Sequence, residues 1–121
     1  IYPDPASKQR KTSAGGRTDL SILQNAGFRV RLRNSHPPVR DRINAVNSKL
    51  MSSTGHRSLF VDPKCKQVIS SLERQTYKEG TSQPNKEDGF DHMNDALGYA
   101  IEYLFPIRKE RTTEQPTRWT A

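Results

Sequence analysis

Four carboxylates crowd into nine positions of a chain that is otherwise strongly basic: Glu87, Asp88, Asp91 and Asp95. Crowded carboxylates repel one another, and a divalent cation can offset that repulsion. Asp91 and Asp95 are four residues apart, so on a helix they project from the same side. The dipole at a helix start also favours acids, which explains Asp91 as an N-cap but explains a second-turn Asp95 poorly. The spacing therefore indicates a metal ligand at Asp95 and leaves both interpretations open for Asp91.

A second candidate carboxylate stands near the other end of the chain. Asp4 lies in Pro3-Asp4-Pro5, where two prolines exclude a central strand and mark Ile1-Tyr2 as the end of one. Strand ends in open α/β sheets collect ligand groups, which favours a ligand role for Asp4. On the residues alone an ordinary Asp-Pro turn is the better interpretation, and it is stronger still for Asp62.

The charge balance favours a polyanionic partner. The chain has 121 residues, with 20 Lys and Arg against 13 Asp and Glu, for a net charge of +7. Nucleic acid is the commonest partner of such a protein, although some soluble proteins are simply basic. Basic residues beside Asp4 are suited to contact a phosphodiester backbone: Lys8, Arg10, Lys11 and Arg17. Arg29, Arg31 and Arg33 share one face of an alternating segment, and either DNA contact or simple solvation explains them.

Several classes of protein are excluded by what the sequence lacks. Cys65 is the single cysteine, so an internal disulfide and a cysteine-based zinc site are ruled out, which fits a reducing compartment. No apolar run approaches the roughly 18 residues of a membrane span. Neither a Gly-x-Ser-x-Gly elbow nor a Walker-type glycine loop is present. The chain starts at Ile1 without a Met, and we expect it to be a fragment.

Hydrophobic periodicity predicts four helices, over residues 20–26, 39–51, 65–72 and 91–105. Short apolar or alternating runs predict strands at residues 1–2, 28–33, 59–61 and 76–78. Alternation of strands and helices is typical of an α/β fold with a mixed, mostly parallel sheet. A hydrophobic content of 31% predicts a thin core. We expect one domain over residues 1–106 and a disordered tail at 107–121.

Three stretches together resemble the C-terminal nuclease domain of the large terminase subunit of tailed phages. They are Tyr2-Pro3-Asp4-Pro5-Ala6, Val61-Asp62-Pro63-Lys64-Cys65 and Asp91-His92-Met93-Asn94-Asp95-Ala96-Leu97-Gly98-Tyr99. The basic loop and Ser21-Ile22-Leu23 that follow the first stretch add to the resemblance, which covers roughly residues 1–106. The family often carries an arginine where this sequence has Gly98.

The resemblance implies a partial RNase H-like fold with its opening strands missing, and an endonuclease that cuts concatemeric viral DNA with Mg²⁺ or Mn²⁺. Asp4 would match the second of three acidic metal ligands and Asp95 the third, while the first would lie upstream of Ile1. Asp91 would support the metal ions, and the basic residues around Asp4 would clamp DNA phosphates.

By the same resemblance, the partners are double-stranded DNA and, in the full-length protein, the portal and the small terminase subunit, without a membrane. The place of action would be the cytoplasm of a bacterial host. The alternative is a truncated, non-catalytic basic module that binds DNA. A protein-binding tail at residues 107–121 is a weaker third possibility.

Overall fold

The computed structural model describes residues 1–10 and 15–107 of the chain, and this part is helical. It contains one short 3-10 helix and four α-helices: η1 (Pro5–Lys8), α1 (Asp19–Asn25), α2 (Val39–Leu50), α3 (Lys66–Arg74) and α4 (Asp91–Leu104). No helix in these ranges has the length and apolar character that crossing a membrane requires. The predicted tail at 107–121 lies, apart from residue 107, outside the described residues.

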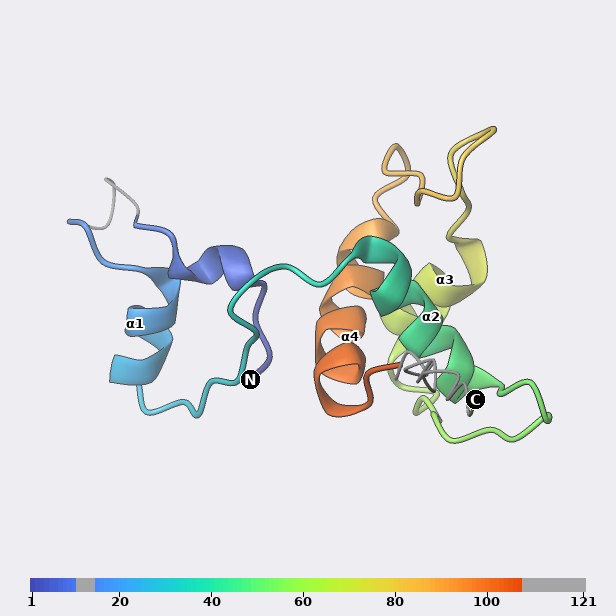
Figure 1. Ribbon diagram of the computed structural model, residues 1–121, viewed down its shortest axis with the longest axis horizontal. Coiled ribbons are helices and arrows are strands. Elements are labelled where there is room, and N and C mark those ends of the chain that lie inside the picture. The colour runs from blue at the N-terminus through green and yellow to red at the C-terminus, as the bar shows by residue number, and fades with distance from the viewer. Residues whose placement is uncertain (11–14, 108–121) are drawn as a thin grey trace, which may run out of the picture.

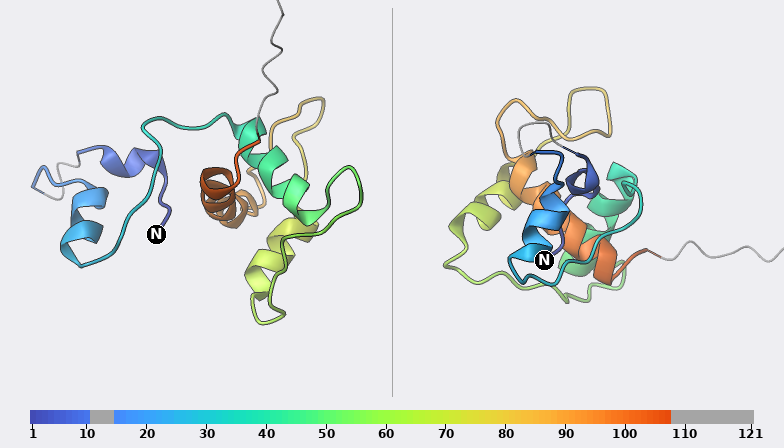
Figure 2. Two further views of the ribbon diagram at one scale, coloured as in Figure 1. Left: turned by 60° about the horizontal axis from the view of Figure 1, so that its bottom comes forward. Right: turned by 90° about the vertical axis from the view of Figure 1, so that its left-hand side faces the viewer.

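The described residues form two parts, seen at opposite ends of Figure 1. One part, here called the N-terminal lobe, comprises residues 1–10 and 15–32 and contains η1 and α1. The other contains α2, α3 and α4, and an extended segment at residues 33–38 joins the two, as Figure 2 also shows. In the second part α4 packs against both α2 and α3. The elements that could carry a site therefore meet around α4.

The core lies where α2 crosses α4. Its buried apolar residues are Ala45, Val46 and Ile101, and partly buried leucines pack around them: Leu50, Leu59, Leu72 and Leu97. α1 contributes no buried residue. A core of this size agrees with the thin one that the composition predicts.

The four predicted helices are confirmed, with α-helix bounds within two residues of those expected. Local signals explain why they were predictable. Thr18 and Ser21 form a capping box at the start of α1, in which each backbone N–H donates to the other hydroxyl at 3.1 and 3.0 Å. Gly27 follows α1 with a φ of +90°, a conformation that favours glycine and ends the helix.

The expected α/β fold is wrong for the described residues, because they contain no strand and no sheet. Residues 29–31 do pair with Ile1: its N–H₃⁺ donates to Arg29 O and its carbonyl accepts from Arg31 N, both at 2.9 Å. This is the bonding pattern of parallel strands, but it stops after one residue. A strand requires a neighbour that satisfies its backbone groups along its length. An alternating sequence pattern indicates that one face of a segment is covered. It does not indicate whether a neighbouring strand pairs with the backbone of that segment.

The segment at 59–61 was also wrongly expected to be a buried strand. Phe60 is 80% exposed, and residues 59–61 are extended without a ladder. Around the fourth predicted strand, a single antiparallel bridge joins Tyr77 to Pro84. Cys65, which the helical stripe places in the core, is exposed just before α3. The apolar run at residues 59–61 therefore belongs to the segment that connects α2 and α3.

The core can be tested by shortening Ile101. We expect Ile101→Ala to lower the free energy of unfolding by about 2 to 4 kcal/mol, because it deletes buried apolar atoms and leaves a cavity. The same change at the exposed Ile22 of α1 should alter that free energy by about 0.5 kcal/mol or less. Urea denaturation followed by circular dichroism measures both, and equal losses would contradict a core centred on α2 and α4.

Candidate functional site

Asp4 lies at the N-terminus of η1 and caps it. Its Oδ1 accepts a hydrogen bond of 2.7 Å from the backbone N–H of Ala6, and Pro5 opens the helix with its fixed φ. Asp62, the second Asp-Pro, forms the same local turn, because its Oδ1 accepts from Lys64 N at 2.8 Å. The turn interpretation is thus confirmed at both positions. It does not exclude a ligand role for Asp4, whose side chain is 48% exposed.

Asp95 lies in the second turn of α4 and faces α2. Its Oδ1 accepts a hydrogen bond of 2.9 Å from Nη1 of Arg42, which forms an ion pair. The two partners differ in exposure: the side chain of Arg42 is 8% exposed and that of Asp95 is 35% exposed. The guanidinium is therefore held inside the helix pair, while the carboxylate remains open to solvent on one side.

Tyr99 links the two acids. It follows Asp95 by one turn of α4, and the guanidinium carbon of Arg42 lies 4.5 Å from the centre of its ring. The carboxylate of Asp4 acts on its hydroxyl as well, and His36 lies beside both Asp4 and the ring. Burial raises the pKa of Tyr99 above its ordinary 10.0; Arg42 opposes this, and the charges of Asp4 and Asp95 add to it. Both carboxylates are thus close enough to act on one ring, although 90 residues separate them in the sequence.

His36 also approaches Asp4 from the segment that joins the two parts. Its Nε2 lies 3.4 Å from Asp4 Oδ1, and its ring centre is 6.5 Å from that of Tyr99. The candidate site therefore combines groups from three elements: Asp4 from the start of η1, His36 from the connecting segment, and Asp95 and Tyr99 from α4.

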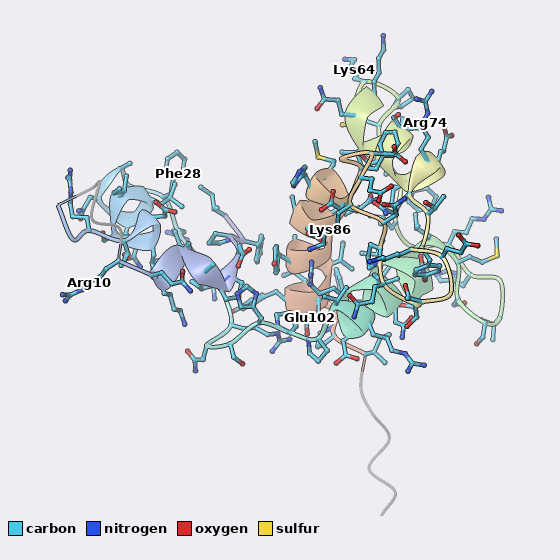
Figure 3. All side chains as sticks on the ribbon, turned by 90° about the horizontal axis from the view of Figure 1, so that it is seen from above. Arg10, Phe28, Lys64, Arg74, Lys86 and Glu102 are labelled. Atoms are coloured by element: carbon cyan, nitrogen blue, oxygen red, sulfur yellow. The ribbon has the colours of Figure 1, made fainter. Side chains whose placement is uncertain are left out.

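A second ion pair holds the N-terminal lobe in this position. Arg33 Nε donates to Oε2 of Glu102 at 2.6 Å, and its Nη2 donates to the carbonyl of the same residue at 3.2 Å. The rings of Tyr2 and Tyr103 lie beside this pair with centres 5.5 Å apart. Figure 3 shows Glu102 on the ribbon of α4. These contacts fix the lobe against α4, and with it the carboxylate of Asp4.

Asp91 is the most buried of the predicted ligands, with a side chain that is 6% exposed. It is not the N-cap of α4: Phe90 occupies that position, and no side chain caps the helix. The N-cap interpretation of Asp91 is therefore wrong. Its Oδ1 has no hydrogen-bond partner among the described residues. Asp91 lines a cavity of about 170 Å³ between α2, α3 and α4, together with Arg42, Asn94 and Asp95.

The carboxylates of Asp4 and Asp95 supply part of what a divalent cation requires. In the described part of the chain, no three His, Cys, Asp or Glu side chains gather as a complete metal centre. Asp4 and Asp95 do supply hard, solvent-accessible oxygens. Mg²⁺ is commonly held by one or two carboxylates, with water and substrate phosphate completing the shell. The two acids fit part of such a site.

The predicted phosphate-binding residues have different surroundings. Lys8 Nζ donates to the carbonyl of Arg33 at 3.1 Å and to Asn34 Oδ1 at 3.3 Å, so it supports the connecting segment. Arg10 lies at the far end of the N-terminal lobe from α4 (Figure 3). Arg17 is exposed, and Lys11 lies outside the described residues. Arg29 and Arg31 are exposed as expected, whereas Arg33 is committed to Glu102.

Three residues of the site were not anticipated: His36, Arg42 and Tyr99. A signal for Arg42 exists in the sequence, because it follows Val39 by three positions and precedes Val46 by four. It thus stands on the apolar side of its own helix, where an arginine needs a buried acceptor. For His36 and Tyr99 we find no comparable signal, since their partner Asp4 is far away in the sequence.

Comparison with known protein families identifies the family of this chain. Residues 1–104 match the family of terminase RNaseH-like domains. The chain belongs to this family. The resemblance that the motifs carry is confirmed, and the coarse function follows: this is a terminase domain of nuclease type, with DNA as the substrate class. No curated protein and no solved structure matches the chain.

Tyr99→Phe tests the link between the acids through pH. Because the pKa of Tyr99 is raised on folding, the unfolded chain loses this proton first as pH rises past 10.0, and stability falls from there. The variant should lack that part of the fall, because phenylalanine has no proton to lose. Urea denaturation of both chains at about pH 9 and about pH 11 measures the difference.

The matched control is Tyr77→Phe, at a tyrosine that is 56% exposed. It should leave the pH dependence of the parent chain unchanged. The same alkaline loss of stability in the parent and in Tyr99→Phe would contradict the burial of Tyr99 between the acids.

Proposed function

We propose that this terminase domain is the metal-dependent endonuclease portion of a phage DNA-packaging terminase large subunit, which cleaves concatemeric viral DNA. The observation that carries the proposal is that Asp4 and Asp95 both approach Tyr99, Asp4 beside His36 and Asp95 paired with Arg42. By the resemblance of the motifs, these two carboxylates would also match two of the family's acidic metal ligands. Local chain geometry alone gives no reason for two acids from distant segments to share one neighbour.

Each residue has a role in this proposal. Asp4 and Asp95 hold Mg²⁺ or Mn²⁺, and Asp91 supports the site from behind Asp95. When bound, the cations would supply a water of lowered pKa and would stabilise the leaving oxygen of the phosphodiester. Arg42 orients the carboxylate of Asp95, and His36 lies 3.4 Å from that of Asp4. Further oxygen ligands would come from water, from DNA phosphate or from outside the described residues.

Double-stranded DNA is the proposed substrate, and the net charge of +7 supports it. Phosphate contacts are assigned to the basic residues that flank Asp4 in sequence: Lys8, Arg10, Lys11 and Arg17. Such contacts position a duplex without reading its sequence. In the full-length protein we propose the portal and the small terminase subunit as partners, in the cytoplasm of a bacterial host.

Substitution of the two acids tests metal binding directly. Asp4→Asn and Asp95→Asn should each weaken Mn²⁺ binding at least about tenfold, which is the lower bound for loss of residues that merely support metal ligands. Isothermal titration calorimetry measures the affinity, and plasmid nicking in Mn²⁺ should fall in parallel. Asp62→Asn is the matched control, since Asp62 precedes a proline and makes the same turn as Asp4.

Two results would count against the nuclease. One is an equal loss of Mn²⁺ affinity in Asp62→Asn, which would mean that the assay reports charge and not a site. The other is undiminished nicking by Asp95→Asn. Steeply salt-dependent DNA binding with no Mn²⁺ binding would instead favour the non-catalytic DNA-binding module.

A further inference from the structure

Arg42 is buried against α4, beside Asp95. It packs on Gly98, where a Cβ would lie at ordinary contact distances of 3.5 Å from Arg42 Cβ and 3.9 Å from Nη1. Its side chain is 8% exposed, one of its donors is bonded to Asp95, and its guanidinium carbon lies 4.5 Å from the ring centre of Tyr99. A guanidinium has five N–H donors, so most of its hydrogen-bonding capacity remains.

Arg42 lines a cavity together with residues whose buried acceptor atoms have no hydrogen-bond partner. Arg42 Nε is buried without a hydrogen-bond partner among the described residues, as are Asp91 Oδ1 and Asn94 Oδ1. These three residues line the same cavity of about 170 Å³, and Asp95 lines it too. Asn94 Nδ2 donates to Ser71 O at 2.9 Å, which holds the amide in place. One guanidinium and two carboxylates therefore line a common space, and only the carboxylate of Asp95 is paired with that guanidinium.

The position of Asp91 makes it a second acceptor for the same guanidinium. Asp91 precedes Asp95 by one helical turn, on the same side of α4. A buried charge whose partner is taken away is strongly unfavourable, because its hydration cannot be recovered. A cation that binds Asp95 both removes the partner of Arg42 and repels it. Asp91 then offers a desolvated carboxylate whose Oδ1 has no hydrogen-bond partner among the described residues, while its Oδ2 lies 4.0 Å from Nδ1 of the exposed His92.

We propose that Arg42 is a positioning residue shared by the two acids. It holds Asp95 in place while no cation is bound there, and it moves to Asp91 when a cation takes Asp95. Asp91 thereby contributes to cation binding without touching the cation. The role of the cation rests on the proposed function, whereas the sharing of Arg42 between Asp95 and Asp91 can be tested without any metal.

The metal-free test uses Asp95→Asn, which removes the charge of Asp95 at constant shape, as a bound cation would neutralise it. In ¹H–¹⁵N NMR spectra the Nε–Hε resonance of Arg42 should shift relative to the parent chain. In the double variant Asp91→Asn/Asp95→Asn that shifted resonance should be lost or should move again. The resonance of Arg33, paired with Glu102, should stay fixed in both variants and so report intact folding.

Identical Arg42 resonances in Asp95→Asn and in the double variant would overturn the proposal, because Asp91 would then make no difference to Arg42. An unchanged Arg42 resonance on going from the parent chain to Asp95→Asn would overturn it equally.

The second test measures Mg²⁺ affinity. Asp91→Asn should weaken binding about tenfold, in the range found for residues that support metal ligands. Asp88→Asn makes the same change of charge at an exposed position three residues earlier and should leave the affinity unchanged. Equal losses in the two variants would overturn the proposal in favour of general electrostatics. A parent chain that binds no Mg²⁺ would overturn the proposed function, and the metal-free spectra would still decide the role of Arg42.

Discussion

The ion pair between the buried guanidinium of Arg42 and the part-exposed carboxylate of Asp95 is the interaction on which the rest of the structure depends. The apolar contact between α2 and α4 is small, with Ala45, Val46 and Ile101 as its buried members. A thin core of this kind does not by itself fix how two helices lie along one another. A buried guanidinium does, because a shift of either helix would leave a desolvated charge without its partner, which is unfavourable.

The same helix also carries the contacts that bring the N-terminal lobe to the site. Asp95, Tyr99 and Glu102 follow one another at spacings of four and three, which places them in one row along α4. Their partners come from α2, from Asp4 and from Arg33 respectively. One polar row on one helix thus organises the other elements, and Asp4 reaches the site because the lobe is attached through Glu102.

Local patterns in the sequence predicted the helices and the place of Asp95 in the second turn of α4, since periodicity and helix position are set by residues a few places apart. The sheet was wrongly predicted for the complementary reason. Alternation at residues 28–33 identifies an exposed and a covered face, but whether a ladder forms depends on a distant backbone, and here it pairs with Ile1 alone. Arg42 was missed because its acceptor lies 53 residues away, although an arginine on an apolar helix face signals a buried partner. The motif around Asp4 marked that acid as a candidate ligand, whereas its place beside His36 and Tyr99 required the three-dimensional structure.

The central claim is that Asp4 and Asp95 belong to one cation site. Paramagnetic broadening of NMR resonances by a low concentration of Mn²⁺ tests it most directly, because the effect falls off steeply with distance from the ion. If the two acids hold one cation, the broadening should be strongest at Asp4 and Asp95 and should include the ring of Tyr99 near them. Broadening centred on the exposed acids Glu87 and Asp88, with Asp4 unaffected, would contradict it.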